Sequence, residues 1–129
     1  MPHPSISILI IDDSETNLLL LESILTGKDW EIHTANSGQK AMDMISAGKP
    51  DLILLDLLMP GIDGHQMMHW LKSNEKLKNI PVIIISAINN ALTRDIFLNK
   101  GAVDFMSKPV KASMLVSRIQ KLLAREADD

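Results

Sequence analysis

The sequence predicts an α/β fold in which a parallel β-sheet carries helices on both faces. Apolar runs of strand length alternate five times with segments of helical periodicity, which is the pattern of repeated strand–helix units. Two of these runs, Leu52–Leu55 and Val82–Ile85, contain no polar residue, as expected for strands that are buried on both faces. Consecutive parallel strands are then joined by right-handed crossovers.

Size and composition indicate one ordinary globular domain. The chain has 129 residues, of which 46% are hydrophobic and 22% charged, and its net charge of −3 gives no support for nucleic-acid binding. The absence of cysteine excludes a disulfide framework, a zinc–thiolate site and a thiol nucleophile. No apolar run approaches the roughly 18 residues of a membrane span, and Met1–Pro4 lacks the features of a signal peptide. We expect a single cytoplasmic domain over residues 1–129, with its core at 5–125 and a tail or linker start at 126–129.

The first half of the chain predicts two strands, each followed by a helix. Ile6–Ile11 is a short apolar run typical of a buried strand, and Ser14 or Asp13 can cap the helix that follows. The apolar positions of that helix recur at helical spacing at Leu18, Leu21 and Leu25. Alternating polar and apolar residues over Glu31–Ala35 predict a more exposed strand at an edge of the sheet. Ser37 is the N-cap candidate of the second helix.

The second half predicts three strands and three helices. Leu52–Leu55 and Val82–Ile85 are the two wholly apolar strands, and Val103–Met106 is a short final strand. A helix over Gly64–Ser73 turns Met67, Met68 and Leu71 inward. A helix over Ala91–Asn99 has a weaker apolar stripe at Leu92, Ile96 and Phe97. The last helix has the clearest pattern, at Leu115, Ile119, Leu122 and Leu123.

Polar residues follow the predicted buried strands where each strand ends. Asp12 and Asp13 follow the first strand, Asp56 the third, Ser86 the fourth and Lys108 the fifth. Because parallel strands direct their carboxyl ends to one edge of the sheet, we expect these side chains to meet there. Crowded carboxylates repel one another, and a divalent cation relieves that repulsion. Oxygen ligands favour Mg²⁺, or Ca²⁺ or Mn²⁺, over zinc, and the ammonium and hydroxyl opposite suit a phosphoryl group.

Each aspartate could instead cap a helix, because Asp is a leading N-cap residue. For Asp63, which precedes a glycine at the start of a predicted helix, capping is the interpretation we prefer. For Asp12 and Asp13, the pairing of two carboxylates and their position at a strand end favour a binding site. Asp56 is a poor candidate for capping because the next predicted helix begins well after it.

Four segments, in this order and at this spacing, carry a resemblance to a known family. They are Asp12–Asp13, the run D-L-L-M-P-G-I-D-G from Asp56, Ser86 followed by alanine, and G-A-V-D-F-M-S-K-P from Gly101. Together they resemble the receiver domain of two-component response regulators over roughly residues 5–125. The resemblance implies a flavodoxin-like, doubly wound fold with strand order 2-1-3-4-5 and five helices.

The resemblance also implies roles for these residues. Asp56 would accept a phosphoryl group from a phosphohistidine on a sensor histidine kinase or a histidine phosphotransfer protein. Asp13, Asp56 and the backbone carbonyl of Leu58 would bind Mg²⁺, and Asp12 would ligate the metal or hold its waters. Lys108 would pair with a phosphoryl oxygen, and its bond to the following proline would be cis.

A switch is implied as well. Ser86 would bind a phosphoryl oxygen and shift inward, and Phe105 would turn inward as Ser86 moves. Ser86 stands where threonine is commoner in the family, and Phe105 where tyrosine is commoner. Leu58 and Ile88, two residues beyond Asp56 and Ser86, are apolar. The resemblance implies that these two positions flank the path of the hydrolytic water. We therefore expect slow self-dephosphorylation of a signalling domain, not turnover by an enzyme.

Two other classes stay open. A Mg²⁺-dependent phosphatase or phosphotransferase with an aspartate nucleophile would resemble D-x-D-x-T after the first strand, whereas this chain has D-D-S there and its nucleophile candidate on the third strand. A pseudo-receiver would be an interaction module that has lost phosphorylation, and the intact polar set argues against it.

The output of the domain is also open, as is whether it stands alone or belongs to a larger regulator or hybrid kinase. In the family, the face of the fourth helix, fifth strand and fifth helix often serves a homodimer or a target. Here that face would include Arg94, Asp95, Lys111 and Arg118.

Overall fold

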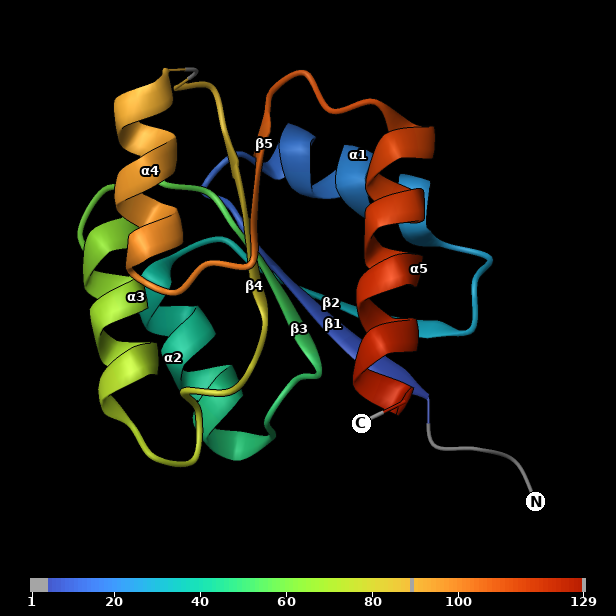
Figure 1. Ribbon diagram of the computed structural model, residues 1–129, viewed down its shortest axis with the longest axis horizontal. Coiled ribbons are helices and arrows are strands. Elements are labelled where there is room, and N and C mark those ends of the chain that lie inside the picture. Colours follow the sequence, from blue (N-terminus) through green and yellow to red (C-terminus); the bar gives the residue numbers. More distant parts are fainter. Residues whose placement is uncertain (1–4, 89, 129) are drawn as a thin grey trace.

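The computed structural model describes residues 5–88 and 90–128, which form a five-stranded parallel sheet with helices on both faces (Figure 1). The strand order is β2-β1-β3-β4-β5, which confirms the order implied by the resemblance. The elements are β1 (Ile6–Ile11), α1 (Glu15–Leu25), β2 (Trp30–Ala35), α2 (Gly38–Ala47), β3 (Leu52–Leu55), α3 (Gly64–Ser73), β4 (Val82–Ser86), α4 (Ala91–Asn99), β5 (Asp104–Ser107) and α5 (Ala112–Asp128). None of the helices within the described ranges is long and apolar enough to cross a bilayer.

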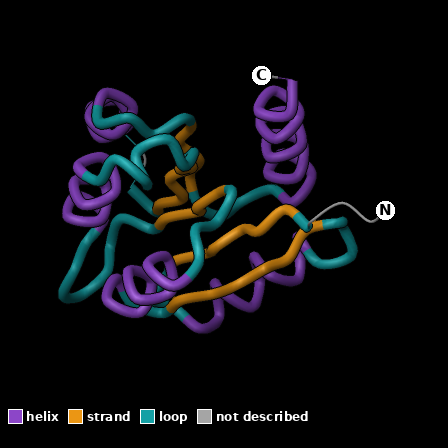
Figure 2. The backbone as a smooth tube through the Cα atoms, turned by 90° about the horizontal axis from the view of Figure 1, so that it is seen from below, coloured by secondary structure: helices purple, strands orange, loops and turns teal. Residues whose placement is uncertain are grey.

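The helices divide into two layers, each with its own hydrophobic cluster. Helices α1 and α5 cover one face of the sheet, and α2, α3 and α4 cover the other (Figures 1 and 2). Strand β3 serves both layers, because Ile53 and Leu55 join the cluster under α2–α4 while Leu52 and Leu54 join the cluster under α1 and α5. Successive side chains of a strand point to opposite faces, so a strand covered on both sides has to be apolar throughout.

The register of the strands brings their ends to one level. Ile11 of β1 lies beside Leu55 of β3, so the residues that follow them leave the sheet as neighbours. Beyond the ladder, the Asp56 N–H donates to the Ile11 carbonyl at 2.9 Å. On the other side of β3, the Lys108 N–H donates to the Ser86 carbonyl, also at 2.9 Å. The backbone therefore fixes the positions of Asp56 and Lys108 before their side chains make any contact.

Two helix caps settle choices that the sequence left open. Ser14, not Asp13, caps α1, and its side chain accepts from the Asn17 N–H at 3.2 Å. Asp63 caps α3 in a reciprocal capping box with Gln66, as predicted. The carboxylate of Asp13 is thus free of a capping role, whereas that of Asp63 is engaged in one.

The structure corrects three boundaries or faces. In α4, Phe97 is the buried residue, whereas Leu92 and Ile96 are 72% and 37% exposed, so the predicted inward stripe was mostly wrong. Strand β5 begins one residue later than predicted, at Asp104. Helix α5 continues to Asp128, so residues 126–128 are helical; Asp129 and the Met1–Pro4 segment lie outside the described residues.

The loop between β3 and α3 needs glycine at two positions, one for its backbone conformation and one for its close approach to a neighbour. Gly61 has a φ of +77°, which residues with a side chain rarely adopt. A Cβ on Gly64 would lie 2.6 Å from the Leu57 side chain and 2.9 Å from its Cα. These glycines let the chain fold back directly after Asp56 and hold Leu58 at the edge of the sheet.

Candidate metal site at the carboxyl edge of the sheet

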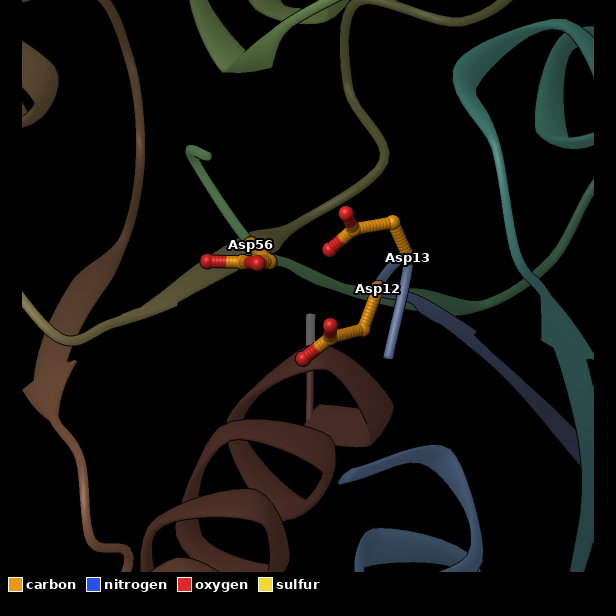
Figure 3. Close-up of side chains that lie close together, drawn as sticks. All are labelled: Asp12, Asp13 and Asp56. Atoms are coloured by element: carbon orange, nitrogen blue, oxygen red, sulfur yellow. The ribbon is translucent and has the colours of Figure 1, made fainter. Parts of the chain in front are cut away.

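Three aspartates converge where β1 and β3 end. Asp12 and Asp13 follow β1, Asp56 follows β3, and Figure 3 shows their carboxylates directed toward a common space. One oxygen from each carboxylate lies within 4.8 Å of the other two. Asp12 and Asp56 are buried, at 1% and 5% exposure, whereas Asp13 is exposed. The cluster is therefore closed beneath and open to solvent on the side of Asp13.

Lys108 supplies the positive charge of the cluster. It follows β5, and its Nζ lies 2.8 Å from Asp12 Oδ2 and 3.6 Å from Asp56 Oδ2. The peptide bond between Lys108 and Pro109 is cis, as the resemblance implied. One ammonium thus faces two buried carboxylates and leaves the third, Asp13, without a cation among the described contacts.

The pKa of Asp56 is raised above its usual value. Burial is the main cause, and the nearby Asp12 carboxylate adds to it. The Lys108 ammonium and the Leu58 N–H, which is 3.4 Å from Asp56 Oδ1, act in the opposite direction but do not cancel the rise. The ionised form of Asp56 would therefore be stabilised by a further positive charge in the cluster.

The donor set suits a hard divalent cation. All three side chains offer oxygen, the chain has no cysteine thiolate to offer, and the exposed Asp13 leaves room for the waters that Mg²⁺ retains. The backbone of Leu58 lies beside the cluster, because its N–H approaches Asp56 at 3.4 Å. These residues fit the Mg²⁺ site that the resemblance implied.

Ser86 and Phe105 lie on the strands next to this cluster. Ser86 ends β4 and is fully buried, and its Oγ accepts from the Ile88 N–H at 3.1 Å. Phe105 of β5 is only 4% exposed, so its side chain already occupies an inward position in this structure. The Phe105 carbonyl accepts from Arg94 Nη1 of α4 at 3.3 Å, which ties β5 to the helix beside it.

One contact at the rim was not found from the sequence. Asn36 Nδ2 donates to Glu15 Oε1 at 2.9 Å and joins the loop after β2 to the first turn of α1. The signal was available, because Asn36 follows β2 in the same way that Asp12 follows β1. The prediction of a binding edge considered only the ends of buried strands, whereas β2 was predicted to be an exposed edge strand.

Comparisons with known proteins agree on one family. Residues 8–120 match the family described as "Response regulator receiver domain". "Response regulator PleD" of Caulobacter vibrioides is 41% identical over 118 residues, which are 92% of this chain but only 26% of PleD. "Polar-differentiation response regulator DivK" of Brucella ovis is 30% identical over 117 residues, which are 91% of this chain and 95% of DivK. The chain therefore spans about a quarter of the first relative and nearly all of the second.

Solved structures show the same fold. The signal receiver domain of a signal transduction histidine kinase from Syntrophus aciditrophicus superposes with a TM-score of 0.83 at 36% identity, over 92% of this chain and 89% of that one. The chemotaxis protein CheY4 of Vibrio cholerae gives a TM-score of 0.85 at 20% identity, over 92% and 98% of the two chains. The second likeness carries the fold alone, and it is the flavodoxin-like fold with strand order 2-1-3-4-5.

Proposed function

The chain belongs to the response regulator receiver domain family, and from this premise we propose that Asp56 accepts a phosphoryl group from a phosphohistidine on a partner protein. The observation that carries the proposal is the position of Asp56. It is a buried carboxylate with a raised pKa, beside the acidic pair Asp12 and Asp13 and 3.6 Å from the Lys108 ammonium. The partner would be a sensor histidine kinase or a histidine phosphotransfer protein.

Asp12, Asp13, Asp56 and the Leu58 carbonyl are the groups that would hold Mg²⁺. When bound, the ion supplies the positive charge that allows an anionic phosphoryl group to approach an anionic site. The three carboxylates keep that charge at the end of β3, because two of them are buried and fixed by the backbone of adjacent strands. A cation held there would also favour the ionised form of Asp56, and only the ionised carboxylate is a nucleophile.

In the transfer step, a carboxylate oxygen of Asp56 forms a bond to phosphorus as the bond from phosphorus to the histidine nitrogen breaks. The imidazole leaves with the electron pair of that bond, and Asp56 becomes an acyl phosphate. Lys108 would neutralise one phosphoryl oxygen, and the 3.6 Å distance from its Nζ to Asp56 Oδ2 supports this role. Positioning and charge neutralisation supply most of the catalysis in phosphoryl transfer.

Phosphorylation would be transmitted through Ser86. The Ser86 hydroxyl accepts from the Ile88 N–H at 3.1 Å and would donate its own proton to a phosphoryl oxygen, so a shift of Ser86 toward that oxygen would move the loop between β4 and α4 with it. Arg94 of α4 donates a hydrogen bond to the Phe105 carbonyl, so a shift of α4 would displace or break this contact with β5. We propose that the surface of α4, β5 and α5, which includes Arg94, Lys111 and Arg118, changes its affinity for a target or for a second copy. A cytoplasmic location remains a prediction.

The acyl phosphate is expected to hydrolyse slowly. Leu58 is 55% exposed and lies beside Asp56, and Ile88 is half-buried beside Ser86. Neither side chain can hold or orient a water molecule for attack on phosphorus. The proposed activity is therefore that of a signalling domain with a long-lived phosphorylated state.

The test is to incubate the protein with Mg²⁺ and acetyl phosphate and to measure its intact mass. The proposal predicts a stable gain of one phosphoryl group that requires Mg²⁺ and is absent in Asp56→Asn. The matched control is Asp63→Asn, which alters the α3 cap and should still be phosphorylated. Continuous release of phosphate with no modified protein would instead favour the phosphatase, and no reaction at all would favour the pseudo-receiver.

A further inference from the structure

The two edges of the sheet, β2 and β5, differ in how their outward backbone groups are satisfied. At the β5 edge, the Phe105 carbonyl accepts a hydrogen bond from Arg94. At the β2 edge, the Ala35 carbonyl accepts from the Asp12 N–H and so faces β1. Because backbone groups alternate in direction along a strand, Ile32 and Thr34 face away from the sheet. Among the described residues, no group outside the β1–β2 ladder forms a backbone hydrogen bond with the outward-facing N–H and C=O of Ile32 and Thr34.

The side chains of β2 are arranged differently on its two faces. Glu31 and His33 are exposed on the side of α2, and His33 Nε2 lies 2.8 Å from Glu31 Oε1. A hollow of about 450 Å³ adjoins them, so α2 does not close over these two residues. On the other face, Trp30 and Ile32 are partly buried against the cluster under α1 and α5.

We propose that β2 is an interface at which two copies of this chain pair edge to edge, as antiparallel strands related by a twofold axis through Ile32. In this register Ile32 lies opposite Ile32 of the second copy, and Trp30 lies opposite Thr34. These are the residues whose backbone groups face outward, so each such pair can exchange both of its N–H···O bonds. The two sheets would become one continuous sheet, and the interface would use the same residues on both copies.

The side chains that would face each other across the axis favour the register centred on Ile32 over the registers centred on Glu31 or His33. With the axis through Ile32, each Glu31 lies opposite His33 of the second copy, so every carboxylate has one imidazole along its strand and another across the interface. An axis through Glu31 would place two carboxylates face to face, which is unfavourable. An axis through His33 would pair two imidazoles and leave Glu31 opposite Ala35. Only the central register makes the edge complementary to itself.

Charged residues on an edge strand usually prevent pairing, so their pattern matters more than their presence. Here a carboxylate and an imidazole lie symmetrically about Ile32, so each Glu31 gains a hydrogen-bonding partner across the interface, and no two carboxylates face each other. The edge is short, so the interface would bury less than the roughly 1,200 Å² of a stable complex. We expect a weak dimer that forms at protein concentrations of about 0.1–1 mM.

Sedimentation equilibrium across that concentration range tests the proposal. The wild-type protein should move from the mass of one chain toward that of two. His33→Glu, which places like charges across the axis, should weaken the association at least tenfold. The double variant Glu31→His/His33→Glu restores the carboxylate–imidazole pairs across the axis and should recover it. His69→Glu is the matched control, because it makes the same change at an exposed position of α3.

A cross-linking experiment tests the register itself. The chain has no cysteine, so Ile32→Cys introduces a single thiol at the axis, and mild oxidation should yield a covalent dimer. Ser23→Cys, an exposed residue of α1, should remain monomeric. The proposal is overturned if the wild type stays monomeric throughout, or if it dimerises but neither His33→Glu nor Ile32→Cys changes the result. The second outcome would place the dimer elsewhere, as at the α4–β5–α5 surface, and would leave the proposed function of Asp56 untouched.

Discussion

Strand β3 and the residue that follows it are buried to nearly the same degree but affect the stability of the protein in opposite ways. Leu52–Leu55 are at most 1% exposed and fill both hydrophobic clusters, and their burial stabilises the fold by about 25 cal/mol per Å² of apolar surface. Asp56 is 5% exposed, and its burial disfavours the charge it would carry in water. The apolar strand therefore stabilises the fold enough to offset the unfavourable burial of the Asp56 carboxylate at its end.

The largest effect is expected from removing the cation of the site. Lys108→Met leaves Asp12 and Asp56 without the ammonium that faces them. It also removes the positive charge that would lie beside the phosphoryl group. We predict that the rate of phosphorylation by acetyl phosphate falls about 10²–10³-fold, as when one charge-stabilising donor is lost from an active site. Lys111→Met is the control, because Lys111 is exposed on the same segment and should change the rate little. An undiminished rate in Lys108→Met would remove Lys108 from the mechanism.

The next prediction concerns the body of the strand. Leu54→Ala opens a cavity under α1 and α5, and we expect the free energy of unfolding to fall by about 2–5 kcal/mol in urea denaturation. The rate of phosphorylation per folded molecule should remain close to that of the wild type, because Leu54 belongs to the hydrophobic cluster under α1 and α5 and not to the carboxylate cluster. A loss of phosphorylation in a well-folded Leu54→Ala protein would show that strand and site are not separable.

A smaller effect is expected at the rim of the site. Leu58→Asn replaces an exposed apolar side chain beside Asp56 with one that can hydrogen-bond a water molecule. The half-life of the phosphorylated protein should fall about tenfold, which corresponds to roughly 1.4 kcal/mol in the barrier to hydrolysis. Intact mass measured over time after removal of the donor gives the half-life. A wild-type half-life of seconds would contradict the expectation of slow hydrolysis.

The smallest effect is a dependence of stability on pH in the absence of divalent cations. The folded-state pKa of Asp56 is raised, so Asp56 favours the folded state fully only below its unfolded pKa of 3.8, and this contribution is lost as the pH rises through the folded value. Asp56→Asn cannot ionise, so its stability relative to the wild type should increase from acid to neutral pH and then level off. Urea denaturation in EDTA measures the difference. A difference that does not change with pH would argue against the burial cost.

Most of the fold could be predicted because its signals are local. The bounds of α3 and α4 agree with prediction, and Asp63 caps α3 as its position before Gly64 indicated. The buried face of α4 could not be predicted, because nine residues give too few turns for a stripe to be distinct. Phe97 rather than Leu92 faces inward because of the neighbouring α3, where the His65 ring lies 4.5 Å from that of Phe97.

For the candidate site, the sequence predicted which residues meet but not which of them form contacts. Parallel topology alone brings the strand ends together, so Asp12, Asp13, Asp56 and Lys108 could be assembled without coordinates. The pairing within that set could not, and the 2.8 Å contact of Lys108 is with Asp12 and not with Asp56. The hydrogen bond from Asn36 to Glu15 was also not predicted, although the position of Asn36 directly after β2 was a signal for it.

The central claim is that Asp56, and no other residue, carries the phosphoryl group. Borohydride reduces an acyl phosphate to an alcohol, so treatment of the phosphorylated protein converts the modified aspartate into homoserine. Digestion and peptide sequencing by mass spectrometry then locate it. The account predicts homoserine at position 56 alone, formed only when Mg²⁺ was present. Homoserine at position 12 or 13, or a stable phosphoprotein that resists borohydride, would contradict it.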